Sequence, residues 1–219
     1  MTTTNAYWDA VREYVDPTGS LWGTPEVGGY NLYRDGQGEM DYRRWCREAP
    51  SRHDLVEQYS WTITDPATVA FVVKHAGPRV VDPMAGSGWW AKLLAEAGAD
   101  VVAYDLALAG PDNEWHKAGV RHASILRGDA VDTVAAHRDR TLLLSWPPYG
   151  FDATPVLNAY PGDRLIYIGE DWGGCCADDG FFEALTKSWT RIAEHVPVQW
   201  YGIHDVVHVY TRQPEGCAS

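Results

Sequence analysis

Apolar and polar residues follow different patterns on the two sides of about residue 60. Before that point apolar periodicity is weak, apart from a short helix expected near residues 7–14, and Gly, Pro, Arg, Tyr and Trp are common. From about residue 65, helical stretches alternate with short β-branched runs, which is typical of a parallel sheet flanked by helices. We therefore predict an N-terminal lid over residues 1–60 and a second unit over residues 61–219.

The second unit reads as seven strands separated by helices. Asp65 followed by Pro66 is typical of an N-cap with proline at the first helical position. Strands are expected at 79–82, 100–104, 124–127, 140–145, 165–169, 198–201 and 206–211, and helices at 66–76, 89–97, 130–137, from 154 and at 181–195. The pattern predicts an α/β, Rossmann-like, mostly parallel sheet flanked by helices. Its last two strands are expected to form a C-terminal antiparallel hairpin.

A glycine-rich turn follows the first of these strands. Residues Asp82–Gly88 read Asp-Pro-Met-Ala-Gly-Ser-Gly, and a helix is expected directly after them. Gly86 and Gly88 permit close backbone approach, and a helix N-terminus presents free amide hydrogens. Such a turn can hold a phosphate or the carboxylate end of a nucleoside cofactor, although a tight structural connection is an equally good interpretation. The third glycine of a dinucleotide fingerprint and the Gly-Lys-Ser/Thr of a P-loop are both missing.

Two aspartates follow the next two strands. Asp105 lies about 20 residues beyond the turn, where an acidic side chain meets ribose hydroxyls in sheets of this type. Asp129 could accept a hydrogen bond from an adenine amino group. Either residue could instead cap a helix or lie in a solvated loop, and for Asp129 the two roles are compatible.

The fourth strand ends in Ser145 and the segment Trp146–Tyr149, which reads Trp-Pro-Pro-Tyr. Two consecutive prolines cannot continue a central strand, so the backbone leaves the sheet rigidly here. This happens at the carboxyl edge, where open α/β sheets bind ligands. A rigid Pro-Pro segment fixes the Pro147 carbonyl and can stack Trp146 and Tyr149 against a planar or cationic group, although a plain loop could also hold two prolines.

Taken in order, Asp82–Gly88, Asp105, Asp129 and Trp146–Tyr149 resemble the motifs of class I S-adenosylmethionine-dependent methyltransferases. The subgroup that the chain resembles comprises amino-methyltransferases with Asp-Pro-Phe-x-Gly-Ser-Gly and Asn-Pro-Pro-Tyr, and Met84 stands in place of the Phe. The resemblance implies S-adenosyl-L-methionine as cofactor.

The resemblance covers about residues 62–212 and also implies which residues meet the cofactor. Thr64 sits where the subgroup places a segment that touches the methionine part of the cofactor. The implied cofactor-binding residues are Thr64, Asp82, Met84, Ala85, Gly86, Gly88, Asp105, Asp129 and Ser145.

Trp146 departs from the subgroup, which has Asn or Asp at that position. The family's polar residue accepts hydrogen bonds from the amino group that is methylated, whereas an indole only donates. The net charge of −12 also disfavours binding to nucleic acid, which depends on Lys and Arg neutralising phosphates. We expect methylation of a nitrogen or oxygen of a small molecule. An adenine or protein side-chain methyltransferase and a non-catalytic cofactor-binding protein remain alternatives.

Methyl transfer needs an acceptor that loses its proton, and several side chains near the carboxyl edge could take it. Glu170 and Asp171 follow the fifth strand, and His204 and Asp205 lie between the last two. Each could equally be a solvated loop group. His204 and His208 share strand parity but lack a third ligand, so no metal is expected.

Eleven tryptophans and twelve tyrosines are more than a core of this size usually requires. Aromatic residues of the lid could close over the pocket and exclude water, or could simply pack the N-terminal segment onto the sheet. These residues are Trp8, Trp22, Tyr30, Tyr33, Trp45, Tyr59 and Trp61. A further set is expected beside the cofactor-edge turns. It comprises Trp61, Trp89, Trp90, Trp146 and Trp172, although Trp89 and Trp90 could instead pack the first turn of their helix.

The remaining composition is that of a globular protein, with 45% hydrophobic and 22% charged residues in 219. No apolar run approaches the roughly 20 residues that span a bilayer, and no secretory signal is visible. Cys46, Cys175, Cys176 and Cys217 have neither zinc-finger nor disulfide-scaffold spacing. A reducing cytoplasm is therefore the expected location.

Overall fold

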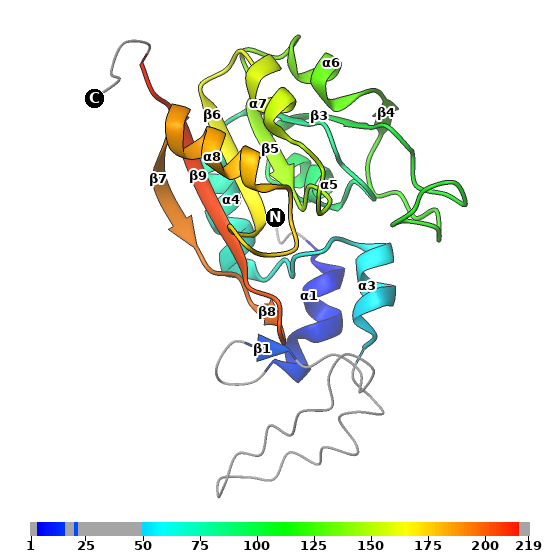
Figure 1. The fold of residues 1–219 in the computed structure, drawn as a ribbon. Coiled ribbons are helices and arrows are strands. Elements are labelled where there is room, and N and C mark those ends of the chain that lie inside the picture. The colour runs from blue at the N-terminus through cyan, green and yellow to red at the C-terminus, as the bar shows by residue number, and fades with distance from the viewer. Residues whose placement is uncertain (1–3, 16–19, 22–49, 215–219) are drawn as a thin grey trace, which may run out of the picture.

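The computed structural model describes residues 4–15, 20–21 and 50–214, and its central feature is a seven-stranded sheet (Figure 1). The strands lie in the order β4-β3-β2-β5-β6-β9-β7. Their bounds are β2 (Arg79–Asp82), β3 (Asp100–Asp105), β4 (Ile125–Arg127), β5 (Thr141–Ser145), β6 (Arg164–Glu170), β7 (Trp189–His195) and β9 (Asp205–Arg212). Strands β2 to β6 pair in parallel, whereas β9 is antiparallel to both β6 and β7. This confirms the predicted Rossmann-like class.

Helices cover both faces of the sheet, as the alternating pattern predicts. Helices α4 (Pro66–Ala76) and α5 (Trp89–Glu96) share one buried cluster with β2, β5 and β6. The opposite face packs against α6 (Ala130–Val134), α7 (Thr154–Ala159) and α8 (Asp179–Ser188) (Figure 1). The N-cap prediction is confirmed, since Asp65 Oδ1 accepts hydrogen bonds from the amides of Ala67 and Thr68 at 3.0 and 3.1 Å.

The helix predicted over 181–195 is wrong in its second half. Helix α8 ends at Ser188, and the chain continues directly as β7 along the edge of β9. Trp189 is 3% exposed and stacks on Tyr160, which anchors the start of this strand. If residues 189–195 were helical, the backbone groups along this edge of β9 would have no partner strand. Pairing as β7 satisfies them, and this tertiary interaction overrides the amphipathic pattern.

The predicted pairing of the last two strands is also wrong. Strand β8 (Gln199–Trp200) pairs in parallel with β1 (Ser20–Leu21), and these two form a separate small sheet. The antiparallel partner of β9 at the edge of the main sheet is β7. Helix α6 is shorter than predicted and ends at Val134.

The described parts of the predicted lid pack onto the rest of the chain. Helix α1 (Ala6–Val11), followed by a 3-10 turn (Arg12–Tyr14), and α3 (Arg52–Gln58) lie together at one end of the sheet (Figure 1). Tyr7 and Val11 are fully buried in the cluster that contains α4 and α5, and Trp200 Nε1 donates to Tyr7 Oη at 3.0 Å. These contacts agree with the interpretation that aromatic residues of the N-terminal segment pack it onto the sheet. Trp22, Tyr30, Tyr33 and Trp45 lie outside the described residues.

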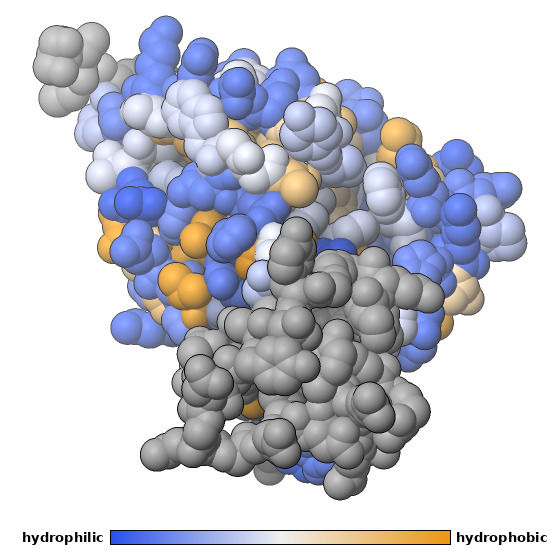
Figure 2. Space-filling view, turned by 60° about the horizontal axis from the view of Figure 1, so that its bottom comes forward, coloured by the Kyte–Doolittle hydropathy of each residue, from blue (hydrophilic) through white to orange (hydrophobic). Residues whose placement is uncertain are grey.

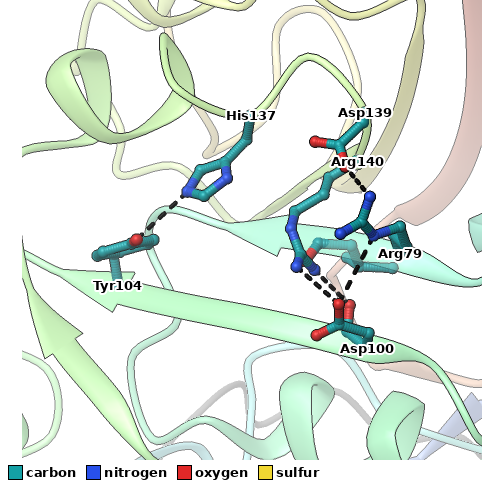
Figure 3. Close-up of polar contacts among 7 residues, drawn as sticks. Arg79, Asp100, Tyr104, His137, Asp139 and Arg140 are labelled. Atoms are coloured by element: carbon teal, nitrogen blue, oxygen red, sulfur yellow. Dashed lines mark hydrogen bonds and ion pairs between the residues drawn. The ribbon is translucent and has the colours of Figure 1, made fainter.

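The amino end of the sheet is held by a charged network (Figure 3). The Arg140 guanidinium donates to the Asp100 carboxylate at 2.7 Å, and to the carbonyls of Asp100 and Val80 at 2.7 and 3.3 Å. Arg79 bridges Asp100 and Asp139. The hydrogen bond from Arg140 lowers the pKa of Asp100. The network joins β2, β3 and β5 at the end opposite the glycine-rich turn.

The described residues visible in Figure 2 are mostly hydrophilic, with small and separate hydrophobic areas. The described residues that are visible in this view (Figure 2) form no broad apolar surface. None of the helices in the described ranges has the length and apolar character needed to cross a membrane.

Candidate functional site

The glycine-rich turn leaves β2 at the carboxyl edge of the sheet and is fastened to β3. Asp82 is 2% exposed, and its Oδ1 accepts a hydrogen bond from the Met84 amide at 3.3 Å. The Ala85 amide donates to the Tyr104 carbonyl at 2.9 Å. Burial raises the pKa of Asp82 to about 7. The turn therefore begins at a buried carboxyl group and is held against the neighbouring strand.

Asp105, at the end of β3, contacts the same turn directly. The Gly86 amide donates to Asp105 Oδ2 at 2.9 Å, and the Ala107 amide donates to Oδ1 at 3.0 Å. Gly86 and Gly88 have φ angles of +56° and +75°, which glycine adopts without strain. Burial raises the pKa of Asp105, and the amide hydrogen bonds oppose that shift. The structure thus brings together two of the motifs that the sequence places about 20 residues apart.

The ring of His116 lies beside Gly86. A Cβ built on Gly86 would stand 2.5 Å from His116 Nε2, so only glycine allows this approach. Nδ1 of His116 lies 3.2 Å from the Glu57 carbonyl oxygen, and burial lowers the pKa of the ring. His116 belongs to the loop 106–124, and no sequence motif links this loop to the glycine-rich turn.

The C-terminal end of α3 is fastened over this region through three consecutive carbonyls. The Glu57 carbonyl meets His116, and the Gln58 carbonyl lies 2.6 Å from His122 Nε2. The Tyr59 carbonyl accepts a hydrogen bond from Ser87 Oγ, within the glycine-rich turn. These α3 carbonyl contacts place the end of the predicted lid over the candidate cofactor turn.

Thr64 and Asp129, two further residues implied by the resemblance, have structural partners. Thr64 is fully buried, and its Oγ1 accepts a hydrogen bond from Trp89 Nε1 at 3.0 Å and donates to Asn5 Oδ1 at 3.1 Å. Asp129 is exposed and caps α6, accepting from the Val131 amide at 2.8 Å. The N-cap interpretation of Asp129 is therefore confirmed, and its adenine role stays a prediction.

Trp146 follows Ser145 at the end of β5 in an unusual conformation. Its φ is +51°, which a large side chain rarely adopts. The Trp146 amide donates to the Ile168 carbonyl at 2.8 Å, and Nε1 donates to Asp205 Oδ1 at 2.9 Å and to Thr62 Oγ1 at 3.0 Å. The indole nitrogen is thus turned toward a buried carboxyl group.

Asp205 is the acidic group that lies deepest beside Trp146. It is 1% exposed, and burial raises its pKa to about 7. The hydrogen bond from Thr62 and the positive charge of Arg52 lower the pKa and offset part of this effect. A carboxyl group with such a pKa changes charge near neutral pH. This property is common at functional sites.

Three indole side chains and one guanidinium gather next to this carboxyl group. Trp61 stacks on Trp146 with ring centroids 5.0 Å apart, and Trp115 meets Trp61 edge-on at 5.4 Å. The Arg52 guanidinium carbon lies 5.3 Å from the Trp61 ring and 5.7 Å from the Trp146 ring. We call Trp61, Trp115 and Trp146 the indole cluster.

The other aromatic residues of the carboxyl edge lie elsewhere. Trp89 and Trp90 form the first turn of α5 and are buried in the core, as the packing interpretation of these two residues predicts. Trp172 is exposed and stacks on Phe182. Tyr149 is 79% exposed, so its ring points into solvent rather than lining the site. The Pro147 carbonyl accepts a hydrogen bond from the Ala177 amide at 3.0 Å.

Glu170 and His204 lie close to each other at the ends of β6 and β9. Glu170 is 5% exposed, and its two carboxylate oxygens accept hydrogen bonds from the amides of His204 and Cys175, both at 2.8 Å. Burial alone would raise the pKa of Glu170, but these amides lower it. The His204 ring is largely exposed, with Nδ1 3.5 Å from Glu170 Oε1. Within the described ranges, no group of three or more His, Cys, Asp or Glu residues could hold a metal ion.

Comparison with known proteins adds information about the fold. No protein-family model matches the sequence, and no curated protein matches it either. The chain is similar in structure to 1,6-didemethyltoxoflavin-N1-methyltransferase from Burkholderia thailandensis, solved with 1,6-didemethyltoxoflavin and S-adenosylhomocysteine. That match has a TM-score of 0.50 and 17% identity and covers 84% of this chain and 94% of the other.

A second similar structure is magnesium protoporphyrin IX methyltransferase from Synechocystis PCC 6803, solved with S-adenosylmethionine. The TM-score is 0.50 and the identity 15%, over 97% of this chain and all of the other. At such identities the likeness concerns the fold. The chain has the Rossmann-like fold that these S-adenosylmethionine-dependent methyltransferases share.

Proposed function

We propose that this protein is an S-adenosylmethionine-dependent methyltransferase that methylates a nitrogen or oxygen of a small molecule. One observation carries the proposal: the hydrogen bond between Gly86 and Asp105 joins the glycine-rich turn to the acidic end of β3. In open α/β sheets, this edge binds nucleoside cofactors. The two similar methyltransferase structures, with the cofactor or its product bound, support the same proposal.

The residues of the turn fit the cofactor. The N-terminus of α5 follows the turn, and the Asp105 carboxylate can accept hydrogen bonds from ribose hydroxyls. The His116 ring packs against Gly86 and holds the turn in place. When bound, S-adenosylmethionine supplies an activated methyl group on a sulfonium. The protein then has to position the acceptor in line and exclude water. In our proposal, the α3 carbonyl contacts and the indole cluster together position the acceptor and exclude water.

Asp205 is our candidate for controlling protonation at the acceptor side. It lies against Trp146, and its pKa of about 7 allows it to take up a proton near neutral pH. Glu170 is a weaker candidate because the backbone amides on its carboxylate oxygens lower its pKa, which makes it a poorer proton acceptor. We retain the cytoplasm as the proposed location, and the free thiols of Cys175 and Cys176 are compatible with it.

The hydrogen bonding of Trp146 favours a small acceptor over adenine. Its indole nitrogen donates to Asp205 and Thr62, and it offers no hydrogen-bond acceptor to a base amino group. The excess of 30 acidic over 18 basic residues points in the same direction.

Thermal unfolding with S-adenosylhomocysteine tests the cofactor assignment. Ligand at about 100 times its Kd should stabilise the protein by about 2.7 kcal/mol. Asp105→Asn should weaken this binding by about tenfold because an amide is a poorer acceptor for ribose hydroxyls than a carboxylate. Absence of stabilisation at millimolar ligand would contradict the proposal.

The acceptor class needs a turnover assay. S-adenosylhomocysteine formation would be followed with small amines, small hydroxyl compounds, oligonucleotides and peptides. Turnover with a small compound supports the proposal, whereas turnover only with oligonucleotides or peptides overturns the small-molecule assignment. Cofactor binding without turnover across the whole panel would favour a non-catalytic binding protein.

A further inference from the structure

Arg52 carries two buried nitrogens that have no hydrogen-bond partner. It is the first residue of α3, and its guanidinium lies over the rings of Trp61 and Trp146. Among the described residues, neither Nε nor Nη2 finds an acceptor. Leaving charged donors desolvated and unpaired is costly, so folded proteins normally pair them. Such an exception requires an explanation.

One acidic group, Asp205, interacts electrostatically with Arg52 but does not resolve the exception. Asp205 is attracted by Arg52, but its carboxyl group is hydrogen-bonded by Trp146 Nε1 and by the side chain of Thr62. Arg52 forms no ion pair with any carboxylate in the part of the chain that the structure describes. The guanidinium therefore has two donors beside the indole cluster that no acceptor in the described chain uses.

The two unpaired nitrogens also have a particular geometry. Nε and Nη2 lie on the same edge of the planar guanidinium, and their N–H groups point the same way. This edge matches the two oxygens of a carboxylate in a bidentate pair. The indole faces beside it suit the planar or apolar part of the same ligand.

We propose that Arg52 binds a carboxylate group of a ligand held against Trp61 and Trp146. The carboxylate belongs either to the methyl acceptor or to the amino-acid end of the cofactor. The inference rests on the proposed function and adds the chemical class of the group that the site recognises. It also explains why two buried nitrogens of Arg52 have no hydrogen-bond acceptor within the described chain.

The test compares Arg52→Met with Arg138→Met, an exposed arginine at the opposite end of the sheet. Calorimetric titration would use two probe pairs, in each of which only one member carries a carboxylate. S-adenosylhomocysteine is paired with 5′-deoxy-5′-methylthioadenosine, which lacks the amino-acid end. Benzoate is paired with benzamide, each added with saturating methylthioadenosine. Arg52→Lys, which keeps the charge without the bidentate fork, serves as a second variant.

We expect Arg52→Met to weaken binding of one carboxylate probe at least tenfold and to leave its uncharged partner within twofold. Loss confined to S-adenosylhomocysteine assigns the carboxylate to the cofactor, and loss confined to benzoate assigns it to the acceptor. Arg52→Lys should lose at least threefold for the same probe, and Arg138→Met should resemble the wild type. The inference is overturned if neither carboxylate probe depends on Arg52, if neither binds the wild type, or if charged and uncharged probes weaken equally. Wild-type binding of S-adenosylhomocysteine reports separately on the proposed function.

Discussion

Two non-glycine residues with positive φ lie at the Pro-Pro segment, one preceding it in sequence and one hydrogen-bonded to it. Trp146 has φ +51° and Ala177 has φ +52°, and the Ala177 amide donates to the Pro147 carbonyl. Each such conformation costs of order 1–3 kcal/mol and persists only where its surroundings determine it. For Trp146 the determinants are the Ile168 carbonyl and the Asp205 carboxyl group. The strain lies at the position where the resemblance expects a polar residue, beside the acceptor site that we propose.

Gly86→Ala should damage the site at the scale of one methyl group. The added Cβ would meet His116 Nε2 at 2.5 Å, on a backbone with φ +56°. We expect a loss of about 1–3 kcal/mol in the free energy of unfolding and at least tenfold weaker binding of S-adenosylhomocysteine. Chemical denaturation and calorimetry measure the two effects.

The matched control is Gly98→Ala, where φ is +98° but nothing lies within 4 Å of the built Cβ. It carries backbone strain without a clash and should retain the wild-type affinity. Equal losses of affinity in the two variants would contradict the role of Gly86 in the cofactor turn.

At the scale of elements, the buried central strands were predicted well, whereas the edge strand β7 was predicted as part of a helix. Strand β5 is fully apolar through Leu142–Leu144 and begins within one residue of its predicted start. By contrast, β7 lies at the edge of the sheet and alternates irregularly between exposed and half-buried positions. Its sequence satisfies a helical pattern as well as a strand, so the neighbouring β9 decides the outcome.

Arg140→Met tests the network that joins the amino ends of three strands. Its guanidinium reaches the carbonyls of Val80 and Asp100, and both lose a charged donor in the variant. We expect the free energy of unfolding to fall by about 1–3 kcal/mol in denaturant titrations near pH 7.5. Arg138→Met, at an exposed neighbour, should change it by less than about 0.5 kcal/mol. A loss no larger than that of Arg138→Met would show that the network adds nothing to stability.

For the whole molecule, burial of acidic groups at the carboxyl edge links stability to pH. Asp82 and Asp205 both have a pKa of about 7 in the folded protein, against 3.8 for the ordinary group. Between about pH 4 and 7 the folded state therefore binds more protons than the unfolded state. The stability from these groups is fully present below pH 4 and is lost as pH rises through about 7.

Asp205→Asn should remove its share of this pH dependence. The amide stays neutral and can still accept a hydrogen bond from Trp146. The variant should therefore gain stability relative to the wild type as pH rises from 4 to 8, by about 2–4 kcal/mol. Denaturant titrations across this range measure the difference.

Asp163→Asn changes an aspartate at an exposed position and provides the control. The difference in its free energy of unfolding from the wild type should be much less dependent on pH than that of Asp205→Asn. If the stability difference between Asp205→Asn and the wild type did not change with pH, the pKa of Asp205 would not be raised in the folded protein.

The sequence by itself determined the features that depend on local chemistry. Apolar runs, the Asp65 N-cap and the glycine-rich turn each depend on residues within a few positions, so their conformations follow from steric limits and nearby hydrogen bonds. The order of the motifs along the chain then indicated the methyltransferase fold, which the structure and its neighbours bear out.

Only the tertiary structure decided which side chains complete the site. Arg52 and His116 lie in segments without a motif, and they reach Trp146 and Gly86 through packing. Trp146 and Thr62 are 84 residues apart in sequence and 3.0 Å apart in the fold. Such contacts depend on how whole elements bury their apolar faces together, and no local pattern records that balance of packing, desolvation and charge.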